Sequence, residues 1–311
     1  MSNILITGGA GFIPSSLADV LSKNKNYNIV FVDNFLTGNK RKITKAPNVK
    51  FIKCDVNNYK DISPIMTSYR FDYVFHYAAV VGVKRTLANP VMVLDDIQGI
   101  KNILDLSKNT GVKRVFYSSS SEVYGEPVEL PQNEHTTPLN SRLPYAIVKN
   151  VGEAFCKSYH VEFNLDYTIF RFFNTYGPKQ STDFVISKFL RAALSNHDIT
   201  IYGDGSQTRS FCFVSDLING LTSLFFTDSI HQPINIGNPR PITMLELASE
   251  VIRLTNSKSE IIFLPLPSDD PRDREPDITK AKEFLKWEPK VSREDGLIQT
   301  IEDVRRQLSF K

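Results

Sequence analysis

Short apolar runs alternate with segments of helical period through the first half of the chain. The runs have the length and composition of buried strands, and they are Ile4–Thr7, Ile29–Asp33, Val49–Cys54, Tyr73–His76, Val115–Ser118 and Tyr167–Phe170. Residues 90–108 are predicted to form one helix, because their apolar positions recur every three or four residues. Strand and helix in regular order predict an α/β protein with a Rossmann-like, doubly wound parallel sheet.

The regular alternation of strand and helix patterns becomes less clear after about Gly177. Further elements are predicted at 184–194, 199–202, 214–226 and 244–254, with proline-rich connections such as 264–271. We therefore expect residues 1–176 to form a Rossmann domain, joined by part of 205–240. Residues 177–311 are expected to form mainly a smaller C-terminal α/β domain that binds the substrate.

Composition narrows the class of protein. Hydrophobic residues make up 41% and charged residues 23%, which predicts a folded protein and excludes wholesale disorder or a coiled coil. The 37 basic and 34 acidic residues nearly cancel, so neither nucleic acid nor an anionic membrane is expected as a partner. Three distant cysteines predict neither a disulfide framework nor a zinc site, and no metal ligands are predicted. With no signal-peptide pattern and no spanning apolar run, we expect a cytoplasmic protein.

A glycine turn follows the first predicted strand immediately. It reads Gly8-Gly9-Ala10-Gly11-Phe12-Ile13-Pro14 and leads into a segment of helical period. Glycines let the backbone turn tightly and approach a pyrophosphate, whose charge is met by the N–H groups at the start of the helix. A turn selected only for its geometry is the less favoured alternative. The residues expected to bind a dinucleotide are Gly8, Gly11, Phe12 and Ile13.

Asp33 ends the second predicted strand, more than 20 residues beyond the first glycine. A carboxylate there accepts hydrogen bonds from the adenosine ribose, which favours NAD over NADP because it repels a 2′-phosphate. Residues 40–42, Lys-Arg-Lys, lie close enough in sequence to weaken that preference. A turn residue that opens the following loop is the alternative.

A third group of candidate residues begins at the end of the fifth strand, with the serine run 118–121 and Glu122. Tyr145 and Lys149 follow in a Y-x-x-x-K pattern. A lysine one helical turn away stabilises a phenolate, so Tyr145 can take a proton from a sugar hydroxyl while Ser120 hydrogen-bonds that hydroxyl. Lys149 is also expected to reach the nicotinamide ribose. The Y-x-x-x-K pattern alone is weak evidence for a catalytic site. Tyr145 and Lys149 could instead be a pair on the surface of a helix, and the serines could simply end a strand.

Several motifs occur in a fixed order along the chain. They are the glycine turn, Asp55-Val56, His76-Tyr77-Ala78-Ala79, the serine run with Val123-Tyr124-Gly125, Tyr145 with Lys149, and Arg171-Phe172-Phe173-Asn174-Thr175-Tyr176-Gly177-Pro178. Together they resemble the extended short-chain dehydrogenase/reductase family that modifies nucleotide sugars, over nearly all 311 residues. The resemblance implies an NAD-dependent enzyme. It also implies a homodimer packed through the helices at 90–108 and 145–160.

The resemblance assigns roles to further residues. The additional cofactor contacts are Asn34, Asp55, Val56, Ala78 and Ala79. The resemblance also implies a UDP-linked nucleotide sugar as the substrate. The residues implied to contact it are Lys84, Asn174, Val185, Tyr202, Arg209 and Arg274. Arg274 is expected to hold phosphate or the acidic part of the sugar, and its alternative is an exposed charge in a polar loop.

The motifs do not agree on one reaction. The C-terminal half resembles UDP-glucuronate decarboxylases through residues 202–211 and 269–278. The loop 79–86 is closer to 4-epimerases and 4,6-dehydratases, and the loop 179–185 is short for a decarboxylase. The sugar therefore stays open at this point.

By the resemblance, all these reactions begin when a base takes the proton of the sugar 4-hydroxyl and hydride passes from carbon 4 to NAD. The ketone then acidifies carbon 5, or makes a uronic acid a β-keto acid that loses carbon dioxide. Glu122 is expected to point to the same side as Ser120, because the two are two residues apart at a strand end, and an extra carboxylate suits proton transfer at carbon 5 or 6. A salt-bridged carboxylate at the cleft edge is its alternative.

The leading hypothesis is therefore UDP-glucuronate decarboxylation, slightly ahead of 4,6-dehydration, with 4-epimerisation as a further alternative. A non-catalytic NAD-binding sensor and a keto-sugar reductase are less favoured. Two departures from the family pattern bear on the site. Pro14 replaces the third glycine. Because proline is tolerated in the first helical turn, we expect dinucleotide binding to survive with a slightly displaced helix. Asp96 replaces an asparagine and, if buried, needs a partner or a proton.

Overall fold

The computed structural model describes residues 1–265 and 273–309, which form two compact units. The first unit comprises Met1–Val123, Leu139–Phe172 and Leu221–Ile234. The second comprises Tyr124–Pro138, Phe173–Gly220 and Asn235–Lys311. The chain thus passes between the units several times. The assignment of 1–176 to the dinucleotide and of 177–311 to the substrate remains a prediction.

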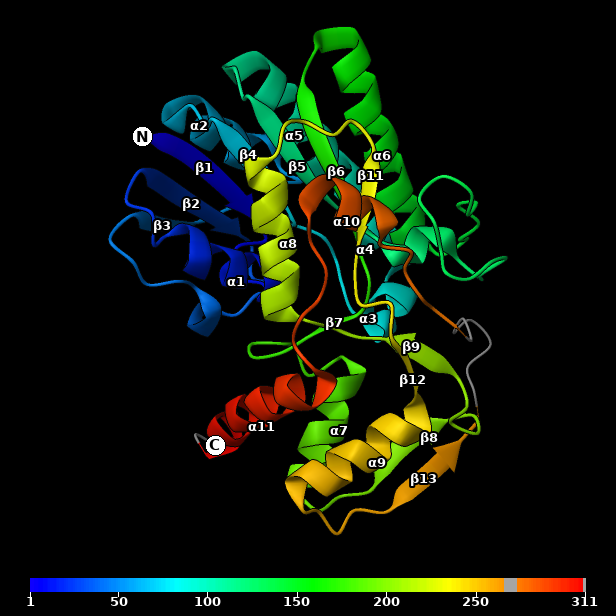
Figure 1. The fold of residues 1–311 in the computed structure, drawn as a ribbon. Coiled ribbons are helices and arrows are strands. Elements are labelled where there is room, and N and C mark those ends of the chain that lie inside the picture. Colours follow the sequence, from blue (N-terminus) through cyan, green and yellow to red (C-terminus); the bar gives the residue numbers. More distant parts are fainter. Residues whose placement is uncertain (266–272, 310–311) are drawn as a thin grey trace. The chain divides into compact units, whose positions relative to one another are not determined.

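A seven-stranded sheet organises the first unit (Figure 1). Its order is β3-β2-β1-β4-β5-β6-β11, and every pairing from β3 to β6 is parallel. The strands are β1 (Ser2–Thr7), β2 (Tyr27–Asp33), β3 (Val49–Lys53), β4 (Tyr73–His76), β5 (Arg114–Ser120), β6 (Asp166–Phe172) and β11 (Pro233–Ile236). The sheet reverses its order at β1 and β4, so the carboxyl ends of these strands open the crevice in which doubly wound folds bind ligands. The predicted fold class is confirmed.

Helices cover the sheet of the first unit. They are α1 (Phe12–Leu21), α2 (Tyr59–Tyr69), α3 (Val83–Ala88), α4 (Pro90–Leu94), α5 (Asp96–Thr110) and α6 (Pro144–Phe163), with short 3-10 turns η1 (Lys40–Lys42) and η2 (Ser121–Tyr124). The helices α2, α5 and α6 pack side by side, and their apolar faces meet strand residues such as Leu5, Val74 and Ile169 in one buried cluster. On the other face, Phe225 near the end of α8 (Val214–Phe226) packs against Phe75. These two layers hold the strand ends in place.

The predicted single helix at 90–108 is wrong in one respect. The structure divides it into α4 and α5, with Asp95 between them. At this break the N–H of Gln98 donates to the carbonyl of Asp95, a tighter i to i+3 pattern than that of an α-helix. The apolar face is still continuous, since Val93, Ile100 and Leu104 are all buried.

The second unit contains two-stranded sheets and helices. Its strands pair two by two as β10-β7, β12-β9 and β13-β8. The elements are β7 (Thr175–Tyr176), α7 (Val185–Leu194), β8 (Ile199–Tyr202), β9 (Thr208–Ser210), β10 (Cys212–Phe213), β12 (Pro241–Thr243), α9 (Met244–Thr255), β13 (Ile261–Leu264), α10 (Thr279–Leu285) and α11 (Arg293–Ser309). Helix α9 begins with a capping box between Thr243 and Glu246, which satisfies N–H groups at the start of the helix. The predicted elements at 184–194, 199–202, 214–226 and 244–254 are confirmed within a residue or so.

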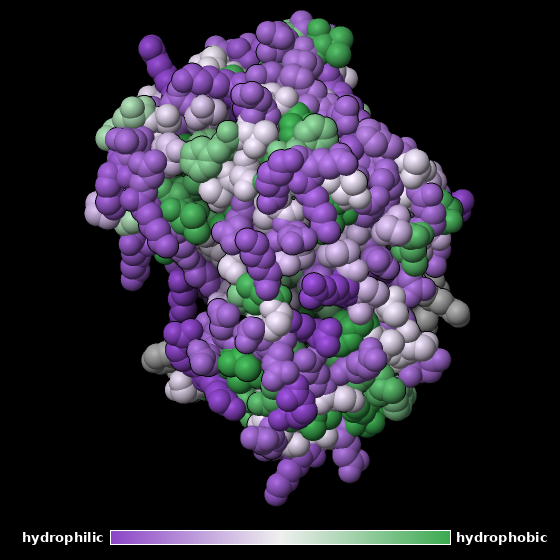
Figure 2. Space-filling view, in the orientation of Figure 1, coloured by the Kyte–Doolittle hydropathy of each residue, from purple (hydrophilic) through white to green (hydrophobic). Residues whose placement is uncertain are grey.

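Hydrophilic side chains cover most of the face in Figure 2, and hydrophobic ones form small separate patches. Within the described ranges, no helix combines the length and apolar character that crossing a bilayer requires.

Candidate active site

The turn that joins β1 to α1 consists of Gly8, Gly9, Ala10 and Gly11. Gly8 has a φ of +66°, and a Cβ there would lie 3.0 Å from the backbone nitrogen of Ala78. A Cβ on Gly11 would lie 2.9 Å from the carbonyl oxygen of Gly8. Gly11 is the N-cap of α1, so the first-turn N–H groups of Phe12 and Ile13 face outward from the helix start. A Cβ would not fit at Gly8 or Gly11. The outward-facing backbone N–H groups at the helix start suit a pyrophosphate.

Pro14 is the third residue of α1, within the first turn. The helix continues through it to Leu21. The physical reason is that an N–H at this position has no intrahelical acceptor, and its loss therefore breaks no helical hydrogen bond. The effect of this proline on dinucleotide binding stays a prediction.

Asp33 ties the end of β2 to the glycine turn. Its carboxylate accepts hydrogen bonds from the N–H of Ala10 at 3.0 Å and from the N–H of Phe35 at 2.7 Å. Burial raises the pKa of Asp33, against those two hydrogen bonds and the charge of Lys42, which lower it. A Cβ on Gly38 would lie only 2.6 Å from the Asp33 Oδ1 atom. The two donors leave acceptor positions on the carboxylate, so the arrangement fits a ribose as well as a turn.

Three of the residues implied as cofactor contacts, Asn34, Asp55 and Val56, lie in the loops after β2 and β3. The Asn34 side-chain amide donates to the Asp55 carboxylate at 3.1 Å, and the N–H of Asn57 donates to its other oxygen at 2.9 Å. The Val56 carbonyl accepts a hydrogen bond from the Asn102 amide at 2.9 Å. Helix α5 therefore fixes the loop that carries Asp55 and Val56.

Thr7 fixes the end of β4, where Ala78 and Ala79 follow. Its hydroxyl oxygen accepts the N–H groups of Tyr77 at 3.1 Å and Ala78 at 3.0 Å. The hydroxyl proton is then left for the His76 Nδ1 atom, 2.9 Å away. Burial lowers the pKa of His76 to about 3, so its imidazole is neutral and accepts that proton. Sequence reasoning missed Thr7, although its place at the end of β1 beside the glycines was a usable signal.

The proposed base lies at the start of α6 and meets the end of β5. The Tyr145 hydroxyl is hydrogen-bonded to the Ser120 side chain, and Glu122 lies close enough for its charge to act on the phenol. Burial and the Glu122 charge both raise the pKa of Tyr145, whereas the Ser120 hydrogen bond lowers it. The structure thus brings Ser120, Glu122 and Tyr145 together. The strand-alternation argument for Glu122 is wrong, because β5 ends at Ser120 and Glu122 lies in the turn η2.

Lys149 follows Tyr145 by one turn of α6 and is buried. Its ammonium donates to the carbonyl of Ser118 at 2.7 Å and lies 5.7 Å from the centre of the Tyr145 ring. Burial lowers the pKa of Lys149 to about 8, while the charge of Asp96 acts in the opposite direction. Because the two effects leave the pKa near neutrality, this lysine can change its charge in the range where proton transfer to and from the phenol matters.

Asp96 is buried, and the expectation that it needs a partner is confirmed. Its carboxylate accepts the N–H of Val80 at 2.7 Å and the Asn57 amide at 3.3 Å. Burial raises the pKa of Asp96, and these hydrogen bonds together with the charge of Lys149 lower it. Asp96 therefore links the loop after β4 to the lysine behind the site.

A buried ion pair that the sequence analysis missed lies one further turn along α6. Glu153 accepts two hydrogen bonds from Arg171 on β6, at 2.8 and 2.7 Å, and one from Ser119 on β5 at 2.6 Å. The signal was present, because Tyr145, Lys149 and Glu153 recur every four residues and so share one face of the helix. The pair fastens α6 to the two strands beside the site.

The residues implied for the nucleotide sugar lie mostly in the second unit. Arg209 is buried and donates to the carbonyl of Thr208 at 2.8 Å, and the Asn174 side-chain nitrogen is buried without a hydrogen-bond partner among the described residues. Arg274 is only 5% exposed, so its alternative as an exposed loop charge is wrong. Val185 begins α7 and Tyr202 ends β8, while Lys84 lies exposed on α3 of the first unit. The motif residues 269–272 lie outside the described residues.

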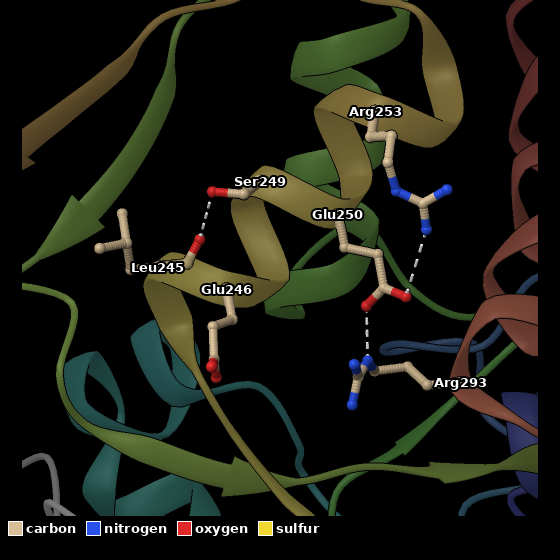
Figure 3. Close-up of a pocket in the computed structure, with 6 residues that line it drawn as sticks. All are labelled: Leu245, Glu246, Ser249, Glu250, Arg253 and Arg293. Atoms are coloured by element: carbon tan, nitrogen blue, oxygen red, sulfur yellow. Dashed lines mark hydrogen bonds and ion pairs between the residues drawn. The ribbon is translucent and has the colours of Figure 1, made fainter.

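A hollow of about 520 Å³ lies on α9 of the second unit. In Figure 3 Glu250 points between Arg253 and Arg293, and its carboxylate lies 2.5 Å from Arg293 and 3.9 Å from Arg253. Glu294 lies 2.9 Å from Arg253. These carboxylates neutralise the arginines, so the hollow offers no free positive charge for a phosphate, and we place the chemistry at the strand ends of the first unit.

Comparison with known proteins agrees with this geometry. The family model described as "NAD dependent epimerase/dehydratase family" matches residues 4–237. UDP-glucuronic acid decarboxylase 5 of Arabidopsis thaliana is 40% identical over 315 residues, which cover 98% of this chain and 90% of that protein.

Two solved structures have the same fold. The UDP-glucose 4-epimerase of Thermotoga maritima, solved with UDP-glucose, is 32% identical with a TM-score of 0.94, over 98% of this chain and 99% of that one. The UDP-glucuronic acid 4-epimerase of Bacillus cereus, solved with UDP-glucuronic acid and NAD, is 30% identical with a TM-score of 0.90, over the same shares. The chain therefore belongs to the NAD-dependent epimerase/dehydratase family of extended short-chain dehydrogenase/reductases, and it is an enzyme that modifies nucleotide sugars with NAD as its cofactor.

Proposed function

We propose that the protein is a UDP-glucuronate decarboxylase. The observation that carries the proposal is the carboxylate of Glu122 beside the Tyr145 phenol, because a simple 4-epimerisation has no use for a second proton-transfer group. The similarity to decarboxylases over nearly the whole chain supports it.

The first step follows from the groups at the start of α6. NAD, when bound at the glycine turn, supplies the oxidising power at carbon 4 of the sugar. Tyr145 takes the proton of the 4-hydroxyl, and the Ser120 hydroxyl holds the same oxygen. The buried ammonium of Lys149 lies on the same helix face and favours the phenolate. We propose that the glycine turn with Asp33, Asn34, Asp55, Val56, Ala78 and Ala79 binds the dinucleotide.

The second step separates the decarboxylase from its relatives. A ketone at carbon 4 makes the carbon 6 carboxylate a β-keto acid. The bond between carbons 5 and 6 breaks, carbon dioxide leaves, and the electron pair passes to the oxygen on carbon 4 as an enolate. Tyr145, now protonated, and Ser120 donate hydrogen bonds to that oxygen. Carbon 5 then takes up a proton, and Glu122 is the carboxyl group proposed to carry it. Carbon 4 finally regains its hydride while Tyr145 returns a proton to the 4-oxygen, which leaves a UDP-pentose and the cofactor in its starting oxidation state.

A second candidate function is 4-epimerisation of UDP-glucuronate. The loop 79–86, which resembles epimerases more than decarboxylases, favours it. The Bacillus cereus epimerase, solved with UDP-glucuronic acid, has the same fold. The two reactions share the substrate and the first step, and they differ only in whether the carboxylate leaves.

The test is a product analysis by mass spectrometry. Purified protein is incubated with UDP-glucuronate, UDP-glucose and UDP-N-acetylglucosamine in turn. Loss of carbon dioxide from UDP-glucuronate supports the proposal. Loss of water from UDP-glucose means a 4,6-dehydratase, and an isomer of unchanged mass means a 4-epimerase. Glu122→Gln serves as the matched variant, and we expect it to lower carbon dioxide release by about 10–1,000-fold while oxidation at carbon 4 continues.

We further propose that the nucleotide sugar is UDP-linked and that Lys84, Asn174, Val185, Tyr202, Arg209 and Arg274 bind it. The related structures solved with UDP-glucose and with UDP-glucuronic acid support the UDP link.

We also propose a homodimer that works in the cytoplasm. Val91, Leu94 and Ile147 are exposed on α4 and α6, which pack against each other in the first unit and offer an apolar surface to a second copy. The three cysteines are free thiols, which suits a reducing compartment. Sedimentation of Val91→Asp against the unmodified chain tests the dimer, since a charge there should produce monomers.

A further inference from the structure

We propose that His160, Asp166 and His231 form a binding site for a divalent transition metal ion such as Zn²⁺. The three residues belong to the first unit but come from three separate elements. His160 lies in the last turn of α6, Asp166 begins β6, and His231 lies in the loop between α8 and β11. In Figure 1 this loop is the yellow segment that leads from α8 to β11.

The distances suit a metal ion. The His231 Nε2 atom lies 2.9 Å and the His160 Nδ1 atom 3.8 Å from Oδ1 of Asp166, and the three candidate ligand atoms lie within 4.8 Å of one another. Ligands at about 2.0–2.1 Å from a tetrahedral zinc ion lie roughly 3.3 Å apart. The distances from Asp166 to His231 and to His160 lie on either side of that value. Small side-chain rotations would therefore bring the three ligand atoms to the spacing that one zinc ion requires.

Within the described part of the chain, one of the three candidate ligand atoms lacks a hydrogen-bond partner. The His160 Nδ1 atom is buried and has no hydrogen-bond partner among the described residues. A buried polar atom without a partner costs free energy, and a metal ion at this point would remove that cost. The Asp166 side chain is 42% exposed, so an ion can enter from solvent and keep water at an open position.

The surrounding side chains hold the two imidazoles in place. Their ring centres lie 3.9 Å apart, so the two rings contact each other. The Tyr167 hydroxyl donates to the His231 carbonyl at 2.8 Å, and its ring contacts both imidazoles. The loop is therefore positioned before any ion binds.

The chemistry of the donors selects the ion. Two imidazole nitrogens and one carboxylate oxygen suit zinc, nickel or copper, whereas magnesium and calcium prefer oxygen ligands throughout. The site lies 15 residues beyond Tyr145 on α6, about 22 Å along a helix that rises 1.5 Å per residue. Its role would be to fasten the loop before β11 to α6 and β6, not to take part in catalysis.

The test is titration of the untagged full chain, cleared of metal with a chelator, by calorimetry with ZnCl₂ and by absorption spectroscopy with CoCl₂. We expect one saturable site per chain, visible absorption of tetrahedral Co²⁺, and a rise in Tm of about 3–6 °C at a hundredfold excess over Kd. His231→Gln lies in a loop and should fold, and we expect it to weaken Zn²⁺ binding by more than about 100-fold. His160→Gln should do the same.

His197→Gln, an exposed histidine in the second unit, is the matched control and should bind normally. No saturable binding to the unmodified chain would overturn the proposal and would leave only a hydrogen bond between His231 and Asp166. Unchanged affinity in both His160→Gln and His231→Gln would overturn it equally. Because the proposed reaction uses other residues, decarboxylation by these variants should stay near that of the unmodified chain.

Discussion

The ammonium of Lys149 donates a hydrogen bond to the carbonyl of Ser118 at 2.7 Å, across the gap between α6 and the end of β5. The same lysine is one helical turn from Tyr145, whose hydroxyl meets Ser120 two residues further along β5. The strand end thus positions both partners of the proposed proton transfer. The predictions below test what each of these groups does.

Removing the phenolic oxygen should stop the reaction. We expect Tyr145→Phe to lower kcat by about 100–10,000-fold, because the base is lost while the glycine turn is untouched. The affinity for NAD, measured by fluorescence titration, should change little. Tyr59→Phe, an exposed tyrosine on α2, is the control and should be fully active. A Tyr145→Phe variant as active as the control would remove this residue from the mechanism.

Asp96 should set the alkaline limb of the pH profile. Lys149 has a pKa of about 8, and the negative charge of Asp96 raises it from a still lower value. If the reaction needs the charged lysine, kcat/KM falls as the pH rises through about 8. Asp96→Asn removes that charge, so the limb should move to lower pH. Asp95→Asn, its exposed neighbour, should leave the limb in place. An unshifted limb in Asp96→Asn would contradict the coupling.

Burial of the Lys149 charge should cost stability at neutral pH. The folded pKa of about 8 lies below the ordinary lysine value of 10.5. The unfolded chain therefore binds more protons between these two pH values, and the free energy of unfolding rises with pH in that range. We expect Lys149→Met to raise the free energy of unfolding by about 1–2 kcal/mol at pH 7, in urea titrations, although activity is lost.

That gain has a distinctive pH dependence. It should shrink as the pH rises from 8 towards 10, because the lysine of the unmodified chain then loses its proton. Lys157→Met, exposed on the same helix, should show no such trend. A Lys149→Met variant that is less stable at every pH would mean that the hydrogen bond to Ser118 outweighs the cost of burying the charge.

Asp33 should decide the choice between NAD and NADP. Its buried carboxylate repels a 2′-phosphate, whereas an asparagine can still accept the Ala10 N–H. We expect Asp33→Asn to lower the ratio of the affinity for NAD to the affinity for NADP by about 10–100-fold. Titration of each cofactor measures the ratio, with circular dichroism as the check that the fold is kept. An unchanged ratio would assign Asp33 to the turn alone.

The sequence predicts the parallel sheet well, because parallel strands buried on both faces appear as short apolar runs. The runs ending at Thr7, Asp33 and His76 all became strands of the predicted sheet. The break at Asp95 was not predictable from periodicity, since the apolar spacing continues through it unchanged.

Site residues that act through long-range contacts were harder to predict. Tyr145 and Lys149 share a local spacing, so a motif reveals them. Glu153 meets Arg171 only after α6 packs on β6, and no local pattern reports that the two side chains pair. The cluster of His160 and His231 spans 71 positions and depends on a loop returning to the end of α6.

Release of carbon dioxide from UDP-glucuronate labelled with ¹³C at carbon 6 tests the central claim most directly. The account predicts labelled carbon dioxide in a one-to-one ratio with a UDP-pentose from the unmodified chain, and about 100–10,000-fold less from Tyr145→Phe. Conversion of the substrate to an isomer that keeps its label would contradict the proposed decarboxylation.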